Sequence, residues 1–212
     1  MIRTVVVEDS VIAQNYFTDL LAKEGDFEIL AVCRDAFEAE KICAAGGVDF
    51  VLMDVLTLHN HSGLAAGKRI RESGKGTKVL IVTSLVDPEV LTQAKIGAAD
   101  SLWYKDHGAE DLVGVIRRTL QGERVFPDSA PNISLGAMFS EDLSPRQIQV
   151  LRSFVMGYTY DEIAAELGIS KRGVRWYMDE IMKMGGFQNR HEMLSAILQN
   201  NFIVTTLLDS EK

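Results

Sequence analysis

Residues 1–121 alternate between short apolar runs and longer amphipathic stretches. The apolar runs are rich in β-branched side chains, which is typical of buried strands. After the first run, Ile12, Tyr16 and Leu20 recur at a spacing of four residues, which predicts a helix. The expected strands cover residues 3–7, 27–33, 50–53, 78–83 and 101–104. The expected helices begin at residue 11 and then cover residues 36–44, 63–72, 88–95 and 109–121.

Strands that are apolar throughout indicate a sheet that is buried on both faces. Such strands belong to parallel sheets, because the helices that connect them cover one face or the other. The first 121 residues are therefore expected to form an α/β domain with a parallel sheet.

The pattern changes at Gly122. Residues 122–140 contain Pro127, Pro131 and Gly136 among small polar residues, and we interpret them as a linker. Only helical patterns follow, over residues 145–156, 160–167, 171–184 and 189–199. The expected organisation is a domain at 1–121, a linker at 122–140 and an all-helical domain at 141–208.

Composition limits the classes of protein that remain. The chain has 212 residues, of which 47% are hydrophobic and 25% charged, as in folded proteins with two domains. Its apolar runs are shorter than the ~18 residues of a membrane span. The acidic N-terminus lacks a signal-peptide pattern, and two cysteines in a chain of this length are typical of reduced thiols. These features favour a cytoplasmic protein, although the net charge of −8 does not by itself favour nucleic-acid binding.

Polar residues of a few chemical types follow the expected strands. Glu8 and Asp9 end the first strand, Asp54 the third, Thr83 the fourth, and Lys105 the fifth. Ligands of a doubly wound sheet bind at the carboxyl ends of its strands, so these side chains are expected to meet. Each one alone is more simply interpreted as a polar residue that faces water.

Together, the five side chains suit phosphoryl transfer to a carboxylate. Glu8, Asp9 and Asp54 provide the hard oxygen ligands that Mg²⁺ prefers. Asp54 beside that ion can act as the nucleophile, while the ion and Lys105 neutralise the charge on the phosphoryl group. The hydroxyl of Thr83 can hydrogen-bond a phosphoryl oxygen.

These residues stand in runs that resemble the receiver domains of two-component response regulators. The runs are Val-Glu-Asp-Ser at 7–10, Leu-Met-Asp-Val at 52–55, Val-Thr-Ser at 82–84 and Tyr-Lys-Asp at 104–106. The resemblance covers residues 1–121. It implies a flavodoxin-like (βα)5 fold, Mg²⁺ at the paired acids, and phosphorylation of Asp54 by a sensor histidine kinase. Thr83 and Lys105 would contact the phosphoryl group.

Two positions differ from the pattern of that family. Leu58 stands four residues after Asp54, where relatives usually have proline. Leu102 stands three residues before Lys105, at the position of the usual aromatic switch residue. We therefore expect Thr83 and Leu102 to form the switch, with an altered coupling between them.

His59-Asn60-His61 follows shortly after Asp54. Two histidines at this spacing in a loop, without a third ligand nearby, are weak evidence for zinc. We interpret them as solvated loop residues.

The C-terminal part contains a predicted helix-turn-helix unit. A short amphipathic helix at 161–167 is followed by the turn Gly168-Ile169-Ser170 and a second helix from residue 171. A three-residue turn with glycine is typical of this unit. Inside the second helix, we expect Val174, Tyr177 and Ile181 to face inward. The side chains expected to face DNA near its N-terminus are Lys171, Arg172, Arg175 and Trp176.

This part resembles the four-helix DNA-binding domain of the LuxR type. The resemblance rests on Leu-Ser-Pro-Arg-Gln-Ile-Gln-Val-Leu at 143–151, Glu-Ile-Ala at 162–164, Leu-Gly-Ile-Ser at 167–170 and Asn-Arg at 189–190. With the receiver, it makes the chain similar to the NarL/FixJ class of response regulators. Gly173 and Asp179 depart from the pattern. From residue 140 onward ten acidic residues stand against eight basic ones, so the electrostatic attraction to DNA is expected to be weak.

The leading hypothesis is a response regulator in which phosphorylation of Asp54 controls dimerisation and binding to promoter DNA. Two alternatives remain. The C-terminal domain binds a protein instead of DNA, or the chain is a constitutive dimer that uses the apolar tail Phe202-Ile203-Val204 and Leu207-Leu208. An independent enzyme is not expected, because the sequence shows no Ser/His/Asp or Cys/His catalytic set.

Overall fold

The computed structural model describes residues 1–106 and 111–204. The chain divides into two compact units, one formed by residues 1–130 and the other beginning at residue 131. Each unit has its own hydrophobic core. Within the described residues, we find no helix with the length and apolar character of a membrane span.

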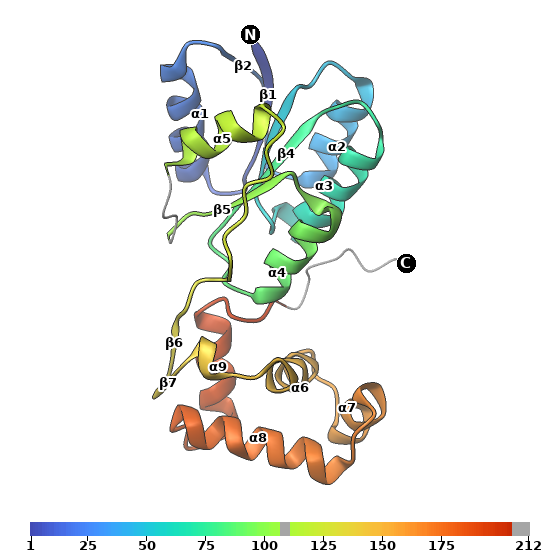
Figure 1. Ribbon diagram of the computed structural model, residues 1–212, viewed down its shortest axis with the longest axis vertical. Helices are drawn as coiled ribbons and strands as arrows, with labels where there is room; N and C mark the ends of the chain where they lie inside the picture. The colour runs from blue at the N-terminus through green and yellow to red at the C-terminus, as the bar shows by residue number, and fades with distance from the viewer. Residues whose placement is uncertain (107–110, 205–212) are drawn as a thin grey trace. The chain divides into compact units, whose positions relative to one another are not determined.

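The N-terminal unit contains a five-stranded parallel sheet with the order β2-β1-β3-β4-β5 (Figure 1). This is the order of flavodoxin-like folds, and it confirms the expected fold class. The strands are β1 (Ile2–Val7), β2 (Phe27–Cys33), β3 (Phe50–Met53), β4 (Lys78–Thr83) and β5 (Ser101–Tyr104).

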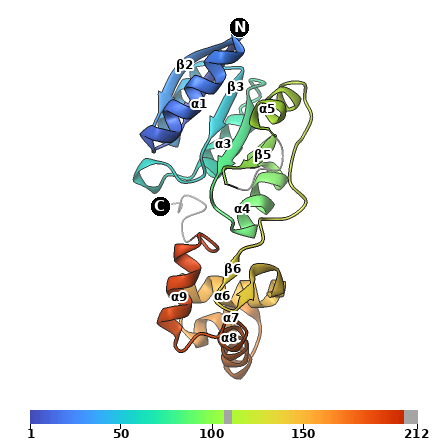
Figure 2. The same cartoon turned by 90° about the vertical axis from the view of Figure 1, so that its left-hand side faces the viewer.

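Helices cover both faces of the sheet. On one face, α1 and α5 pack against β1, β3 and β4, and α2, α3 and α4 cover the other (Figures 1 and 2). The helices are α1 (Val11–Glu24), α2 (Ala36–Ala45), α3 (Gly63–Glu72), α4 (Pro88–Gln93) and α5 (Leu112–Leu120).

Two expected helices differ in their bounds by more than one residue. The helix expected at 88–95 ends as an α-helix at Gln93 and continues as a π-helix, Ala94–Ala98. The helix expected at 109–121 begins at Leu112, because the side chain of Asp111 caps it by accepting from Gly114 N at 3.2 Å. Residues 109 and 110 of that prediction lie outside the described residues.

Strand register brings the polar strand ends together. Val7 at the end of β1 pairs with Met53 at the end of β3, and Thr83 at the end of β4 pairs with Tyr104 of β5. Because parallel strands in register end at the same edge, the residues that follow them become neighbours.

Over its described residues, 131–204, the second unit forms a short hairpin, one 3-10 turn and then four α-helices (Figure 2). The hairpin joins β6 (Ser134–Leu135) to β7 (Met138–Phe139). The helices are α6 (Pro145–Val155), α7 (Tyr160–Leu167), α8 (Lys171–Gly185) and α9 (Arg190–Gln199).

The hairpin corrects the expected linker at 122–140. Residues 131–140 belong to the second unit, where Leu135 and Met138 are part of the hydrophobic core. Gly136, which looked like linker punctuation, has a φ of 66° and approaches α8 closely. A Cβ there would lie 2.3 Å from the carbonyl oxygen of Gly185. The glycine is therefore required by packing.

The apolar tail is also placed in part. Phe202 and Ile203 are buried in the core of the second unit. They are thus not available as the dimer surface that the constitutive hypothesis requires. Residues 207 and 208 of that hypothesis lie outside the described residues.

Candidate phosphoacceptor site

Three carboxylates meet at the carboxyl ends of β1 and β3. The backbone N–H of Asp54 donates to the carbonyl of Val7 at 2.9 Å, which places Asp54 beside the first residues after β1. Carboxylate oxygens of Glu8, Asp9 and Asp54 lie within 4.8 Å of one another. Glu8 is buried, at 2% exposure. This set offers only hard oxygen donors, so it fits Mg²⁺, which is commonly held by a few carboxylates and water.

Lys105 completes the site from the end of β5. The backbone N–H of Lys105 donates to the carbonyl of Thr83 at 2.9 Å, which holds Lys105 beside the end of β4. Its Nζ donates to Glu8 Oε2 at 2.6 Å and to Asp54 Oδ2 at 2.9 Å. The ammonium therefore joins two carboxylates that would otherwise repel each other.

Burial and charge oppose one another at Asp54. Burial raises the pKa of Asp54, Glu8 raises it further and Lys105 lowers it, and the result is about 6. Burial lowers the pKa of Lys105, but Asp54 and Glu8 outweigh it, so that the pKa is raised. Lys105 is therefore a fixed positive charge beside the central carboxylate.

The backbone around Asp54 is tightly enclosed. The N–H of Val55 donates to Asp54 Oδ1 at 2.7 Å, which leaves the two carboxylate oxygens in different surroundings. Behind the residue, a Cβ on Gly63 would lie 1.8 Å from the carbonyl oxygen of Asp54. Only glycine can occupy this first position of α3 without moving the backbone that carries Asp54.

Thr83 and Leu102 are both buried. Thr83 Oγ1 accepts from Leu85 N at 3.1 Å, so its hydroxyl is oriented by the loop that follows β4. The neighbour of Thr83 across the strands is Tyr104, which is 3% exposed. Within the described part of the chain, the Tyr104 hydroxyl has no hydrogen-bond partner. The strand neighbour of Thr83 is thus an aromatic residue, Tyr104, which stands one position before Lys105.

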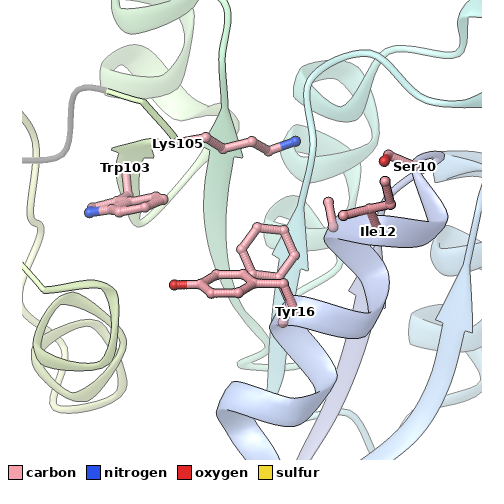
Figure 3. A pocket seen from close by; sticks show the side chains of 7 residues that line it. Ser10, Ile12, Tyr16, Trp103 and Lys105 are labelled. Carbon is pink, nitrogen blue, oxygen red and sulfur yellow. The ribbon is translucent and has the colours of Figure 1, made fainter.

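A shallow pocket of about 410 Å³ opens beside Lys105. Figure 3 shows Lys105 extending toward Ser10, with Tyr16 and Trp103 below it. The lining is mostly apolar, and Ile12 at its rim is 83% exposed. The polar site is therefore bordered by an exposed apolar surface of α1.

The structure corrects one premise about the loop after Asp54, although His59 is exposed there as expected. His59 and His61 do have a third potential ligand nearby, Asp35, which follows β2. The sequence separates this residue from the histidines by more than twenty positions, and β1 lies between β2 and β3 in the sheet. The loop after β3 reaches the end of β2, where Leu58 N donates to the carbonyl of Arg34 at 2.9 Å, and the sequence carries no signal for this contact.

The helix-turn-helix geometry of the second unit is as expected. Gly168 takes a φ of 64° after α7, and Ser170 Oγ accepts from Gly173 N at 3.0 Å to cap α8. Val174 and Ile181 are buried. The expected inward position of Tyr177 is corrected in part, because Tyr177 is only half-buried and Met178 is the fully buried neighbour.

The four side chains expected to face DNA are exposed along the first turns of α8: Lys171, Arg172, Arg175 and Trp176. Lys171 pairs with Asp161 of α7 at 2.7 Å, which offsets part of its charge. Trp176 stacks edge-on against Tyr177 with ring centroids 4.9 Å apart. The exposed surface of α8 thus combines positively charged side chains with the ring of Trp176, which packs against Tyr177.

Comparison with known proteins agrees with this architecture. Residues 4–117 match the family described as response regulator receiver domain, and residues 141–195 match the family of bacterial regulatory proteins of the luxR type. The chain therefore belongs to the response regulators of the NarL/FixJ type, which are DNA-binding transcription regulators controlled by phosphorylation.

Two curated relatives are similar over nearly the whole chain. The uncharacterized transcriptional regulatory protein YvfU of Bacillus subtilis (strain 168) is 28% identical over 96% of this chain and 100% of its own length. The oxygen regulatory protein NreC of Staphylococcus aureus (strain JH9) is 26% identical over 95% of this chain and 99% of its own.

A solved structure shares the fold. RcsB from Salmonella enterica serovar Typhimurium, bound to promoter rprA in the presence of the phosphomimetic BeF3⁻, has a TM-score of 0.60 and 18% identity. The match covers 93% of this chain and 98% of that one.

Proposed function

We propose that Asp54 is the residue phosphorylated by a sensor histidine kinase, with Glu8, Asp9 and Asp54 holding Mg²⁺. The observation that carries this proposal is the position of Lys105, whose Nζ contacts both Glu8 and Asp54. A phosphoryl group on Asp54 would bring negative charge to the place where this ammonium already lies. The exposed apolar surface around Ile12 supports a protein as the donor, because it borders the site.

In the proposed reaction, a carboxylate oxygen of Asp54 attacks phosphorus, and the P–N bond to the donor histidine breaks. The imidazole leaves with the bonding electrons and takes up a proton. Mg²⁺ held by Glu8, Asp9 and Asp54 would supply charge neutralisation for the phosphoryl oxygens. Lys105 moves its Nζ from the carboxylates to a phosphoryl oxygen, and the hydroxyl of Thr83 turns from Leu85 N toward another.

We further propose that the second unit binds promoter DNA through Lys171, Arg172, Arg175 and Trp176. Their exposure on the first turns of α8 supports this, because that end of a recognition helix enters the major groove. The DNA-bound RcsB structure is consistent with the same use of this fold. A DNA target also supports a cytoplasmic location and a regulatory role without an enzymatic activity of its own.

Phosphorylation is proposed to pair two copies of the chain and so to strengthen DNA binding. Two adjacent half-sites bound by a dimer compensate for the weak electrostatic attraction of a unit with more acids than bases.

The test uses beryllofluoride with Mg²⁺ on the full chain and on Asp54→Asn. In the wild type alone, the solution mass is expected to double. Its affinity for the promoter DNA upstream of its own gene is expected to rise at least tenfold. An unchanged mass and affinity at full occupancy of Asp54 would reject the proposed switch.

A protein partner in place of DNA is the second candidate. The pairing of Lys171 with Asp161 and the acidic Asp179 favour it, since both reduce the positive charge facing outward. A complete lack of mobility shift at low salt, with the phosphomimetic present, would select this candidate.

A further inference from the structure

Two loops of the N-terminal unit bring three potential metal ligands together. Asp35 follows β2 and caps α2, and His59 and His61 lie between β3 and α3. Nitrogen and oxygen atoms of these three side chains lie within 4.8 Å of one another. His61 Nδ1 is 2.8 Å from Asp35 Oδ1, and His59 Nδ1 is 3.2 Å from Asp35 Oδ2.

These spacings are close to those of a metal centre. Ligands bound at about 2.0 Å in a tetrahedral site are separated by about 3.3 Å. Each nitrogen–oxygen distance is near that value, although the two end on different oxygens of Asp35, and one donor atom of each residue lies within 4.8 Å of the others. Side-chain rotations would bring the three donors to one ion. A metal bound at Nδ1 requires that nitrogen of each imidazole to be without a proton, so the contacts to Asp35 would be replaced by bonds to the ion.

The backbone holds the ligands in place. Thr57 Oγ1 donates to the carbonyl of His61 at 2.8 Å and accepts from Ala36 N at 3.0 Å, which ties the histidine loop to the start of α2. His59 and Asn60 both have positive φ, 63° and 59°. Two successive non-glycine residues in this region are uncommon, and they turn His59 and His61 toward the same carboxylate.

The ligand chemistry selects the kind of ion. Two imidazoles with one carboxylate suit zinc and neighbouring first-row divalent ions, whereas Mg²⁺ and Ca²⁺ prefer oxygen alone. The side chains of Asp35, His61 and His59 are 18%, 37% and 69% exposed. Water therefore has access to complete the coordination.

We propose that Asp35, His59 and His61 form a second cation site, which binds one zinc-class divalent ion. The site is separate from the acidic cluster and is independent of the proposed phosphorylation. The ion joins the N-terminus of α2 to the segment that begins directly after Asp54, where Val55 N donates to Asp54 Oδ1.

The test is a calorimetric titration of the untagged full chain with Zn²⁺, in excess Mg²⁺ so that the acidic cluster is occupied. One equivalent is expected to bind. His59→Asn and His61→Asn are each expected to lower the affinity at least tenfold, and asparagine at position 59 tolerates the positive φ. Co²⁺ in place of Zn²⁺ is expected to give the absorption bands of nitrogen and oxygen coordination in the wild type and weakened bands in both variants.

Two controls separate this site from others. His191→Asn removes an exposed histidine of α9, and Asp54→Asn alters the acidic cluster; both are expected to retain wild-type Zn²⁺ affinity. Circular dichroism verifies that the variants are folded. Unchanged affinity in folded His59→Asn and His61→Asn would overturn the proposal. So would an equal loss in either control.

Discussion

The charge of Asp54 is maintained against its burial. The pKa of about 6 lies above the usual value of 3.8, because burial favours the neutral form. The folded state therefore holds a proton on Asp54 in a pH range where the unfolded chain has lost it. The stability that this proton contributes is fully present below pH 3.8 and is lost as the pH rises through about 6.

Replacing Asp54 by asparagine is expected to stabilise the protein at pH 7. Without Mg²⁺, the gain should be about 1–3 kcal/mol, because the variant no longer has a buried charge. The gain should shrink as the pH falls from 7 to 4. Urea unfolding at several pH values in chelator measures it, with exposed Asp19→Asn as a control that changes little. A gain independent of pH would contradict the explanation.

The hydroxyl of Tyr104 offers a second test at this scale. A buried hydroxyl without a partner costs about 1–3 kcal/mol of stability. Tyr104→Phe is therefore expected to raise the unfolding midpoint, whereas Tyr16→Phe, at a residue that is 55% exposed, should leave it unchanged. Thermal and urea unfolding provide the measurement. A destabilised Tyr104→Phe would show that the hydroxyl is satisfied, for example by water.

The sequence could predict the acidic site around Asp54, but it could not predict the cluster of Asp35 with His59 and His61. Glu8, Asp54 and Lys105 follow apolar runs directly, and strand ends of a parallel sheet meet at one edge. The neighbourhood of Asp35 and His61 depends on how the loop after β3 turns back to the end of β2, across the position of β1 in the sheet. Hydrophobic patterning does not carry this information.

At the scale of the element, α8 concentrates the proposed DNA contacts at one end. Arg175→Ala is expected to weaken binding to promoter DNA by about tenfold, since one base or phosphate contact is worth about 1–3 kcal/mol. Mobility shifts at several salt concentrations measure the affinity. Lys183→Ala, an exposed cation in the last turn of the same helix, is the matched control and should have a smaller effect. Equal losses would indicate attraction by general charge alone.

In the second unit, the helices were predicted more closely than the two short strands β6 and β7, and the reason is local chemistry. Ser144, Thr159 and Ser170 each accept from a backbone N–H at the start of a helix, and such capping residues mark a helix start in the sequence. The hairpin of β6 and β7 has strands of two residues, which are too short to show alternation. Proline and glycine in the same stretch then favoured a linker.

At the scale of the whole molecule, the order of the two domain families along the chain indicates the function more clearly than the composition does. A net charge of −8 is unusual for a DNA-binding protein, yet residues 4–117 and 141–195 match a receiver and a LuxR-type domain. The sequence predicted this pairing because each domain has local motifs. It could not predict the operator or the kinase, since neither leaves a local motif.

The buried hairpin also determines where the molecule can be cut. A fragment of residues 131–212 retains Leu135 and Met138 in the core of the second unit, whereas one of residues 141–212 lacks both. Removal of two buried side chains of this size costs several kcal/mol, comparable to the whole stability of a small domain. The longer fragment is expected to give dispersed amide NMR signals and a cooperative melting transition, and the shorter one to aggregate on expression. Ten residues that resemble a tether would thereby decide whether the DNA-binding half exists as an independent protein.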